Sequence, residues 1–84
     1  MEVEVVDARG LRCPMPVIRL ARAASLLPPG SVVEVWATDP AADADVPAWC
    51  RMRGQEFLGA EVVKAEADPE GGHTAYRVRT VDDT

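Results

Sequence analysis

Two prolines that follow Cys13, at positions 14 and 16, constrain the fold of this chain more than any other feature. Proline lacks a backbone N–H and has a fixed φ, so it disrupts a strand but fits the first turn of a helix. Apolar residues then recur at helical spacing, at Val17, Leu20, Ala21, Ala24 and Leu27. The sequence therefore predicts a helix over residues 14–27, with Cys13 as its N-cap, which ends at the Pro-Pro-Gly of 28–30.

The rest of the chain divides into one more helix and four β-like segments. Asp45 is the predicted N-cap of the second helix, and Gly54 its C-terminal stop. Its apolar side consists of Val46, Trp49, Cys50 and Met52. Alternation or β-branched composition predicts strands at residues 3–7, 31–38, 56–67 and 74–81, with a turn at 68–72 and a bulge at Gly59.

The order of these elements is β-α-β-α-β-β, which predicts an α/β (α+β) fold. We expect a two-layer sandwich, in which two helices cover one face of a four-stranded mixed sheet. The first two strands should be parallel, with a right-handed crossover, and the last two should form a hairpin. The strand at 31–38 is expected to be central, with little room for a wet face. All 84 residues are expected to form a single domain.

Composition and charge narrow the classes of function. Apolar residues make up 48% of the chain and charged residues 27%, which is typical of a folded soluble domain. No run approaches the roughly 20 apolar residues of a membrane span, and the acidic N-terminus does not resemble a signal peptide. We therefore expect a cytoplasmic protein without membrane contact. The net charge of −5 argues against direct nucleic-acid binding.

The two cysteines have different surroundings. Cys13 lies at a predicted loop-to-helix junction, where the N–H groups of Met15 and Val17 and the helix dipole would favour a thiolate. Arg9 and Arg12 could add to this effect. The alternative is an inert, buried thiol, which is common for cysteine. Cys50 is expected to be such a packed thiol, because it lies beside Trp49 on an apolar helix side.

Other candidate residues have simpler explanations. His73 is expected to be a solvated turn residue. The acidic residues Asp39, Asp43 and Asp45 are better explained by turns and helix caps than by an ion site. Trp36 and Trp49 are expected in the core, because nothing basic is interleaved with them.

The segment DARGLRCPMP resembles the D-x-x-G-x-x-C-P-x-P signature of the TusA (SirA-like) family of sulfur carriers, and ATDPAADADVPAWC is similar to that family's loop into its second helix. The resemblance implies that Cys13 accepts a sulfane sulfur as a persulfide from a cysteine desulfurase or a rhodanese. The outer sulfur would then pass to a downstream acceptor protein, in transfer RNA thiolation, molybdenum-cofactor assembly or sulfur oxidation. No metal or organic cofactor is implied. The alternative is a regulatory or RNA/protein-binding module that uses the same fold without sulfur transfer.

The matching motif also suggests roles for residues around Cys13. Residues expected to support the motif are Asp7, Gly10, Arg12, Pro14, Met15 and Pro16, of which Asp7 and Gly10 shape the loop. Four arginines are candidates for contacts with partner proteins: Arg9, Arg19, Arg51 and Arg53. Arg51 and Arg53 are expected on the exposed side of the second helix, outside the motif, where a solvated face is the default interpretation. We expect the free protein to be a monomer.

Overall fold

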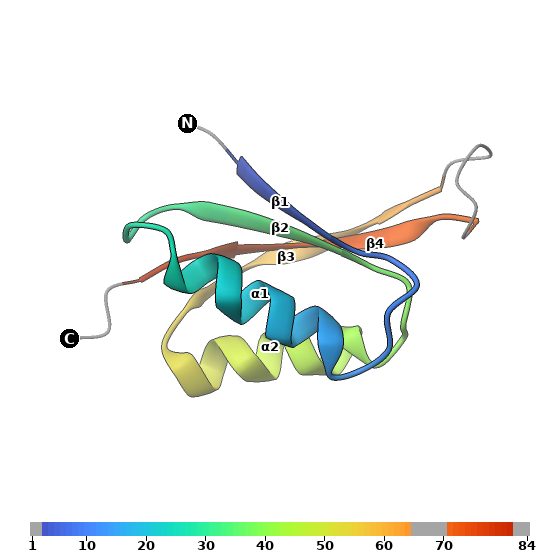
Figure 1. Cartoon of the computed structure of the whole chain (residues 1–84), viewed down its shortest axis with the longest axis horizontal. Helices are drawn as coiled ribbons and strands as arrows, with labels where there is room; N and C mark the ends of the chain where they lie inside the picture. The colour runs from blue at the N-terminus through green and yellow to red at the C-terminus, as the bar shows by residue number, and fades with distance from the viewer. Residues whose placement is uncertain (1–2, 65–70, 82–84) are drawn as a thin grey trace.

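The computed structural model describes residues 3–64 and 71–81, which form a four-stranded sheet with two helices on one face (Figure 1). The predicted element order and two-layer architecture are confirmed. The elements are β1 (Val3–Ala8), α1 (Met15–Ser25), β2 (Val32–Ala37), α2 (Ala42–Arg53), β3 (Glu56–Val63) and β4 (His73–Arg79).

The strand order is β1-β2-β4-β3, so β2 is an inner strand as predicted. β1 and β2 are parallel, whereas β4 is antiparallel to both of its neighbours. The predicted bulge in β3 is confirmed by a register shift between Phe57 and Gly59. Residues 65–67 of the predicted third strand and most of the predicted turn lie outside the described residues.

The first helix begins later than predicted. Its N-cap is Pro14 rather than Cys13, and its first residue is Met15. The Met15 N–H donates to the Arg12 carbonyl at 2.8 Å, in a turn that precedes the helix. The helix ends at Ser25, two residues before the predicted end, and Pro28 and Pro29 follow.

The second helix begins earlier than predicted: its N-cap is Ala41 rather than Asp45, and Asp39 holds the turn that precedes it. The Asp39 carboxylate accepts the Ala41 N–H at 3.0 Å, and its carbonyl accepts the Ala42 N–H at 3.1 Å. Asp45 therefore lies inside the first turn, and Pro47 lies inside the helix. The predicted stop is confirmed, because Gly54 adopts the left-handed conformation with φ of 69°.

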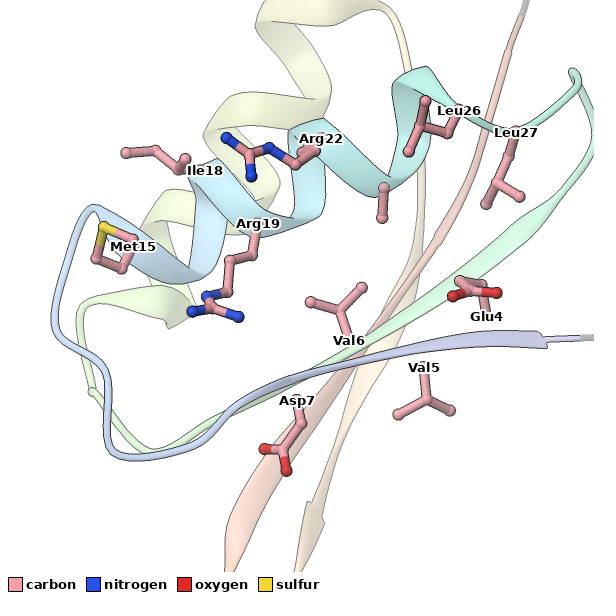
Figure 2. Close-up of a pocket in the computed structure, with 11 residues that line it drawn as sticks. Glu4, Val5, Val6, Asp7, Met15, Ile18, Arg19, Arg22, Leu26 and Leu27 are labelled. Atoms are coloured by element: carbon pink, nitrogen blue, oxygen red, sulfur yellow. The ribbon is translucent and has the colours of Figure 1, made fainter.

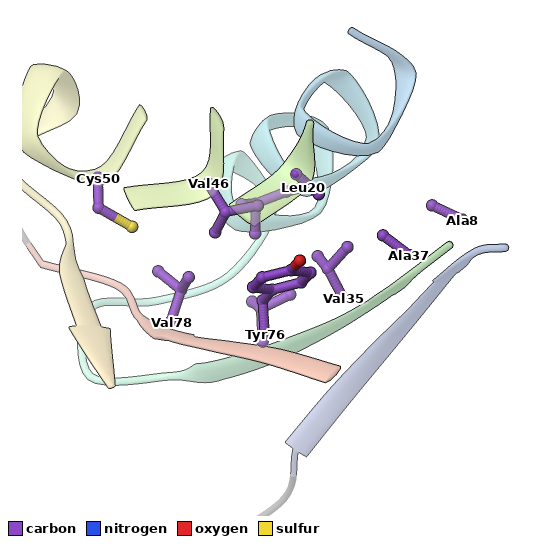
Figure 3. Close-up of a cluster of buried hydrophobic side chains, with 10 residues drawn as sticks. Ala8, Leu20, Val35, Ala37, Val46, Cys50, Tyr76 and Val78 are labelled. Atoms are coloured by element: carbon purple, nitrogen blue, oxygen red, sulfur yellow. The ribbon is translucent and has the colours of Figure 1, made fainter. Parts of the chain in front are cut away.

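The core lies between the sheet and the helices. Val6 of β1 points toward α1, which lies over this edge of the sheet (Figure 2). The largest fully buried side chains are Leu20, Val33, Val35, Val46, Val78 and Cys50, with Tyr76 packed among them (Figure 3). The prediction for Met52 is wrong: its side chain is 81% exposed.

The other face of the sheet is open, and the predictions for the strand at 31–38, for His73 and for Trp36 are wrong. Alternate residues of β2 are only half-buried, and Glu34 there accepts a hydrogen bond from Arg77 at 2.7 Å. His73 is the first residue of β4 rather than a turn residue, and its ring centroid lies 4.9 Å from that of Trp36. The Arg9 guanidinium also lies over Trp36, at 5.0 Å from the ring centroid. Trp36 is thus a half-buried stacking residue, not a core residue.

Within residues 3–64 and 71–81, no helix combines the length and the apolar character that crossing a membrane requires.

Candidate functional site

Cys13 lies in the loop between β1 and α1, and its thiol is exposed as predicted. Asp39, in the loop between β2 and α2, and Asp45, in the first turn of α2, hold it. The Cys13 N–H donates to Asp39 Oδ2 at 2.7 Å, and Cys13 Sγ donates to Asp45 Oδ2 at 2.7 Å. The sulfur is therefore accessible and fixed in place by contacts that join distant parts of the sequence.

The loop that carries Cys13 is shaped by one contact with Thr38, just after β2, and by one local pairing between Asp7 and Arg9. Gly10 adopts a φ of 79°, a conformation that favours glycine, and its N–H donates to Thr38 Oγ1 at 2.9 Å. The Asp7 carboxylate accepts two hydrogen bonds from the Arg9 guanidinium, at 2.9 and 2.8 Å. This pairing lowers the pKa of Asp7 to about 2.

The electrostatics at the thiol are opposite to those predicted. The pKa of Cys13 is raised, first by the hydrogen bond to Asp45 and then by desolvation and the negative charges of Asp45 and Asp39. The predicted thiolate at a helix N-cap is therefore wrong. The helix begins one residue later, the Met15 N–H is already bonded to Arg12, and the earlier start of α2 brings Asp45 to the sulfur.

Asp39 and Asp45 both contact Cys13, which the sequence did not predict, and Asp45 is the one that reaches the thiol. Its chain position fitted a helix cap, and nothing local indicated that it would meet a cysteine 32 residues away. Its neighbour Asp43 accepts a hydrogen bond from the Tyr76 hydroxyl, which ties the first turn of α2 to the core. Burial and this bond raise the pKa of Tyr76.

The predicted partner-contacting arginines do not form one patch. Arg9 is held by Asp7 at the end of β1, and Arg19 lies on α1, two turns from Cys13 at most. Arg51 and Arg53 lie in the last turn of α2, whereas Asp45 lies in its first turn. Eight residues of helix, about 12 Å, separate Asp45 from Arg53. Arg12 is exposed. The pKa of Asp39 is lowered mainly by the two backbone N–H groups that donate to its carboxylate, and to a smaller extent by the positive charge of Arg12.

Cys50 is buried, as predicted, and burial raises the pKa of its thiol. Within the part of the chain that the structure describes, no three His, Cys, Asp or Glu side chains gather as metal ligands. The chemistry of this site is thus that of one exposed thiol beside two carboxylates.

Comparison with known proteins identifies the class to which this arrangement belongs. The family model described as Sulfurtransferase TusA matches residues 4–79. The sulfur carrier protein TusA of Pseudomonas aeruginosa is 40% identical over 75 residues, which are 89% of this chain and 86% of that protein. The chain therefore belongs to the TusA sulfurtransferase family.

Two further similarities concern domain size and fold. The putative sulfur carrier protein YrkF of Bacillus subtilis is 44% identical over 57 residues, which are 68% of this chain but only 31% of YrkF. A SirA-like protein from Desulfitobacterium hafniense, in its crystal structure, superposes with a TM-score of 0.70 at 22% identity, over 96% of this chain and 100% of that one. The latter similarity supports the fold.

Proposed function

We propose that this protein is a sulfur carrier whose Cys13 accepts a sulfane sulfur as a persulfide and passes it to a second protein. The observation that carries the proposal is the accessible Cys13 thiol, held by Asp39 and Asp45 in a chain of the TusA family. The donor would be a persulfide-bearing protein such as a cysteine desulfurase or a rhodanese. The acceptor would serve transfer RNA thiolation, molybdenum-cofactor assembly or sulfur oxidation, in the cytoplasm.

The transfer needs no oxidant or reductant beyond the persulfide itself. Cys13 Sγ attacks the outer sulfur of the donor persulfide, a new S–S bond forms, and the donor's S–S bond breaks. Its electron pair goes to the inner donor sulfur, which becomes a thiol when it takes up the proton lost by Cys13. Delivery repeats the step, with an acceptor cysteine as nucleophile and Cys13 as the leaving thiolate.

Asp45 gives this carrier a resting state of low reactivity. Each unit by which the pKa of a thiol rises lowers its thiolate fraction about tenfold, whereas its nucleophilicity increases only about threefold. The hydrogen bond to Asp45 therefore protects free Cys13 from unspecific reaction. A donor that pairs with Asp45 or displaces it would restore the reactive thiolate at the moment of transfer.

Intact mass tests the proposal. When the protein is incubated with a cysteine desulfurase and cysteine, we expect it to gain one sulfur atom, and we expect Cys50→Ala to gain it too. Cys13→Ala should gain none. An unmodified wild-type protein would contradict the proposal and would leave the binding-module alternative.

A further inference from the structure

A groove of about 650 Å³ runs between α1 and the outer edge of β1 (Figure 2). Among the strands that the structure describes, β1 lies at an edge of the sheet and has β2 as its only neighbour. One stripe of α1 faces this edge and includes apolar side chains that solvent reaches, with Ile18 46% exposed. The stripe consists of Met15, Ile18, Arg19, Arg22 and, at the end of the helix, Leu26.

The two edges of the sheet differ in how they are protected. β3, at one edge, carries a bulge at Gly59 and the exposed charges of Glu56 and Glu61, features that hinder pairing with another strand. β1, at the other edge, also carries exposed carboxylates, at Glu4 and Asp7, but it pairs with β2 in unbroken register over all of its six residues and has no bulge, proline or lysine. The edge at β1 is therefore open to a further strand.

The charge of the groove indicates what such a strand would carry. Arg19 and Arg22 are exposed, and neither makes an ion pair within residues 3–64 and 71–81. Two carboxylates line the groove with them: Asp7 is paired with Arg9, and Glu4, on β1, offsets one of the two arginine charges. Because both arginines lie on the α1 side of the groove, a ligand with acidic side chains on its helix-facing side would pair with two cations that have no ion pair among the described residues.

We propose that an extended acidic segment of a partner protein binds in this groove as a fifth strand beside β1. β-Augmentation of this kind takes its affinity from main-chain hydrogen bonds and its specificity from side-chain contacts, here with the Met15–Leu26 stripe. This inference rests on the proposed function in one respect: the partner that supplies the segment is a sulfur donor or acceptor.

The groove also leads toward the reactive thiol. Met15 lines one end of it and is two residues from Cys13, and the loop from β1 to Cys13 leaves at this same end (Figure 2). A partner cysteine placed shortly beyond the bound strand would therefore meet Cys13. The alternative occupant is the β1 strand of a second copy of the protein. Pairing of two β1 edges would bring the α1 arginines of both copies together, and their like charges would repel.

Disulfide capture tests the inference without relying on sulfur transfer. The probes are short synthetic peptides of alternating valine and glutamate, each followed by a flexible spacer and a terminal cysteine that carries β-mercaptoethanol as a mixed disulfide, so that exchange with Cys13 releases β-mercaptoethanol. At a fixed concentration of β-mercaptoethanol, we expect the acidic peptide to form about tenfold more mixed disulfide with Cys13 than a peptide with lysine in place of glutamate. Intact mass and peptide mapping measure the adduct.

Variants and a modified peptide make the test specific. Arg19→Glu with Arg22→Glu should reverse the preference, whereas the matched charge change Arg51→Glu with Arg53→Glu on α2 should leave it within about twofold. N-methylation of alternate peptide nitrogens should abolish the preference, because it removes strand donors. Equal capture of the acidic and lysine peptides would overturn the inference, and so would capture of the methylated acidic peptide equal to that of the unmethylated one. A wild-type dimer that dissociates in the Arg19→Glu, Arg22→Glu variant would also overturn it.

The outcomes separate this inference from the proposed function. Capture can succeed in a protein whose Cys13 never gains sulfur from a desulfurase, which would refute the carrier role alone. Conversely, normal sulfur loading with no peptide preference would refute only the fifth strand.

Discussion

The Cys13 thiol donates a hydrogen bond to a carboxylate, and this contact determines its chemistry more than its place near a helix does. A helix N-terminus would lower the pKa of a thiol, but the anion of Asp45 at 2.7 Å stabilises the protonated form. The resting protein therefore has a thiol that is accessible but held in its protonated, less reactive form.

Asp45→Asn should lower the pKa of Cys13, because it removes the negative charge that favours the protonated thiol and leaves only a neutral amide oxygen to accept the hydrogen bond. Near neutral pH we expect alkylation of Cys13 by iodoacetamide to become faster by about threefold for each unit of pKa change. The pH profile of the alkylation rate, followed by mass spectrometry, measures the effect.

Glu56→Gln removes one equivalent charge from β3 and serves as the control, with an unchanged profile expected. A profile for Asp45→Asn that overlays the wild type would show that the Asp45 contact does not control the thiol.

At this scale, the sequence was sufficient to identify Cys13 as exposed and Cys50 as packed, because each depends on neighbouring residues in the chain. It was insufficient for the electrostatics. The pKa of Cys13 depends on Asp39 and Asp45, which are distant in sequence and reach the thiol only in the folded chain.

Among the elements, α2 has the greatest influence on the site, because its first turn carries Asp45. The Tyr76 hydroxyl, on the inner strand β4, fixes this turn through Asp43. The core, the helix and the thiol are thereby connected in one chain of contacts.

Tyr76→Phe should lower the free energy of unfolding by about 1–3 kcal/mol, because it removes a hydrogen bond to a charged group and leaves the ring in place. Urea denaturation measures this loss, and faster hydrogen exchange of the amides at 42–45 would locate it in the first turn of α2. A variant with wild-type stability and exchange would contradict the anchoring role of Tyr76.

A second contact between elements joins Thr80, just after β4, to the loop between α1 and β2. The buried Thr80 hydroxyl donates to the Pro28 carbonyl at 2.8 Å and accepts the Ser31 N–H at 3.0 Å. Thr80→Val keeps the shape of the side chain but leaves both groups without this partner. We expect a loss of about 1–3 kcal/mol in the free energy of unfolding by urea, and Thr80→Ser, which keeps the hydroxyl, should lose less. Equal losses in the two variants would point to packing instead.

The types and order of the elements could be predicted because each has a local cause: the prolines before α1, the β-branched run of β2 and Gly54 after α2. The starts of the two helices could not, because competing caps stand close together. Asp39 and Asp45 are both suitable helix starters, and only the contacts of Asp39 with Ala41 and Cys13 decide between them.

For the whole molecule, paired carboxylates set the response to acid. The pKa values of Asp7, Glu34 and Asp39 are lowered in the fold; for Glu34 the causes are hydrogen bonds from Trp36 and then Arg77. A lowered pKa contributes stability that is complete above the pKa of the unfolded chain, about 4, and is lost as the pH falls through the folded value.

The free energy of unfolding should therefore decrease as the pH falls below about 4, and urea midpoints at several pH values measure this. Glu34→Gln should make the decrease shallower, because this carboxylate can no longer take up a proton. Glu61→Gln, which removes an exposed carboxylate from the same open face, is the control. A free energy of unfolding that stays constant down to pH 2, or that falls equally steeply in the wild type and in Glu34→Gln, would contradict this role of the paired carboxylates.

The most direct test of the account is to locate transferred sulfur within the chain. Trypsin separates the two cysteines, because Cys13 falls in the peptide of residues 13–19 and Cys50 in that of residues 23–51. After incubation with a cysteine desulfurase and radioactively labelled cysteine, we predict that alkylated digests carry the label on the peptide of residues 13–19. Label on the peptide of residues 23–51, or on neither, would contradict the claim that Cys13 carries the sulfur.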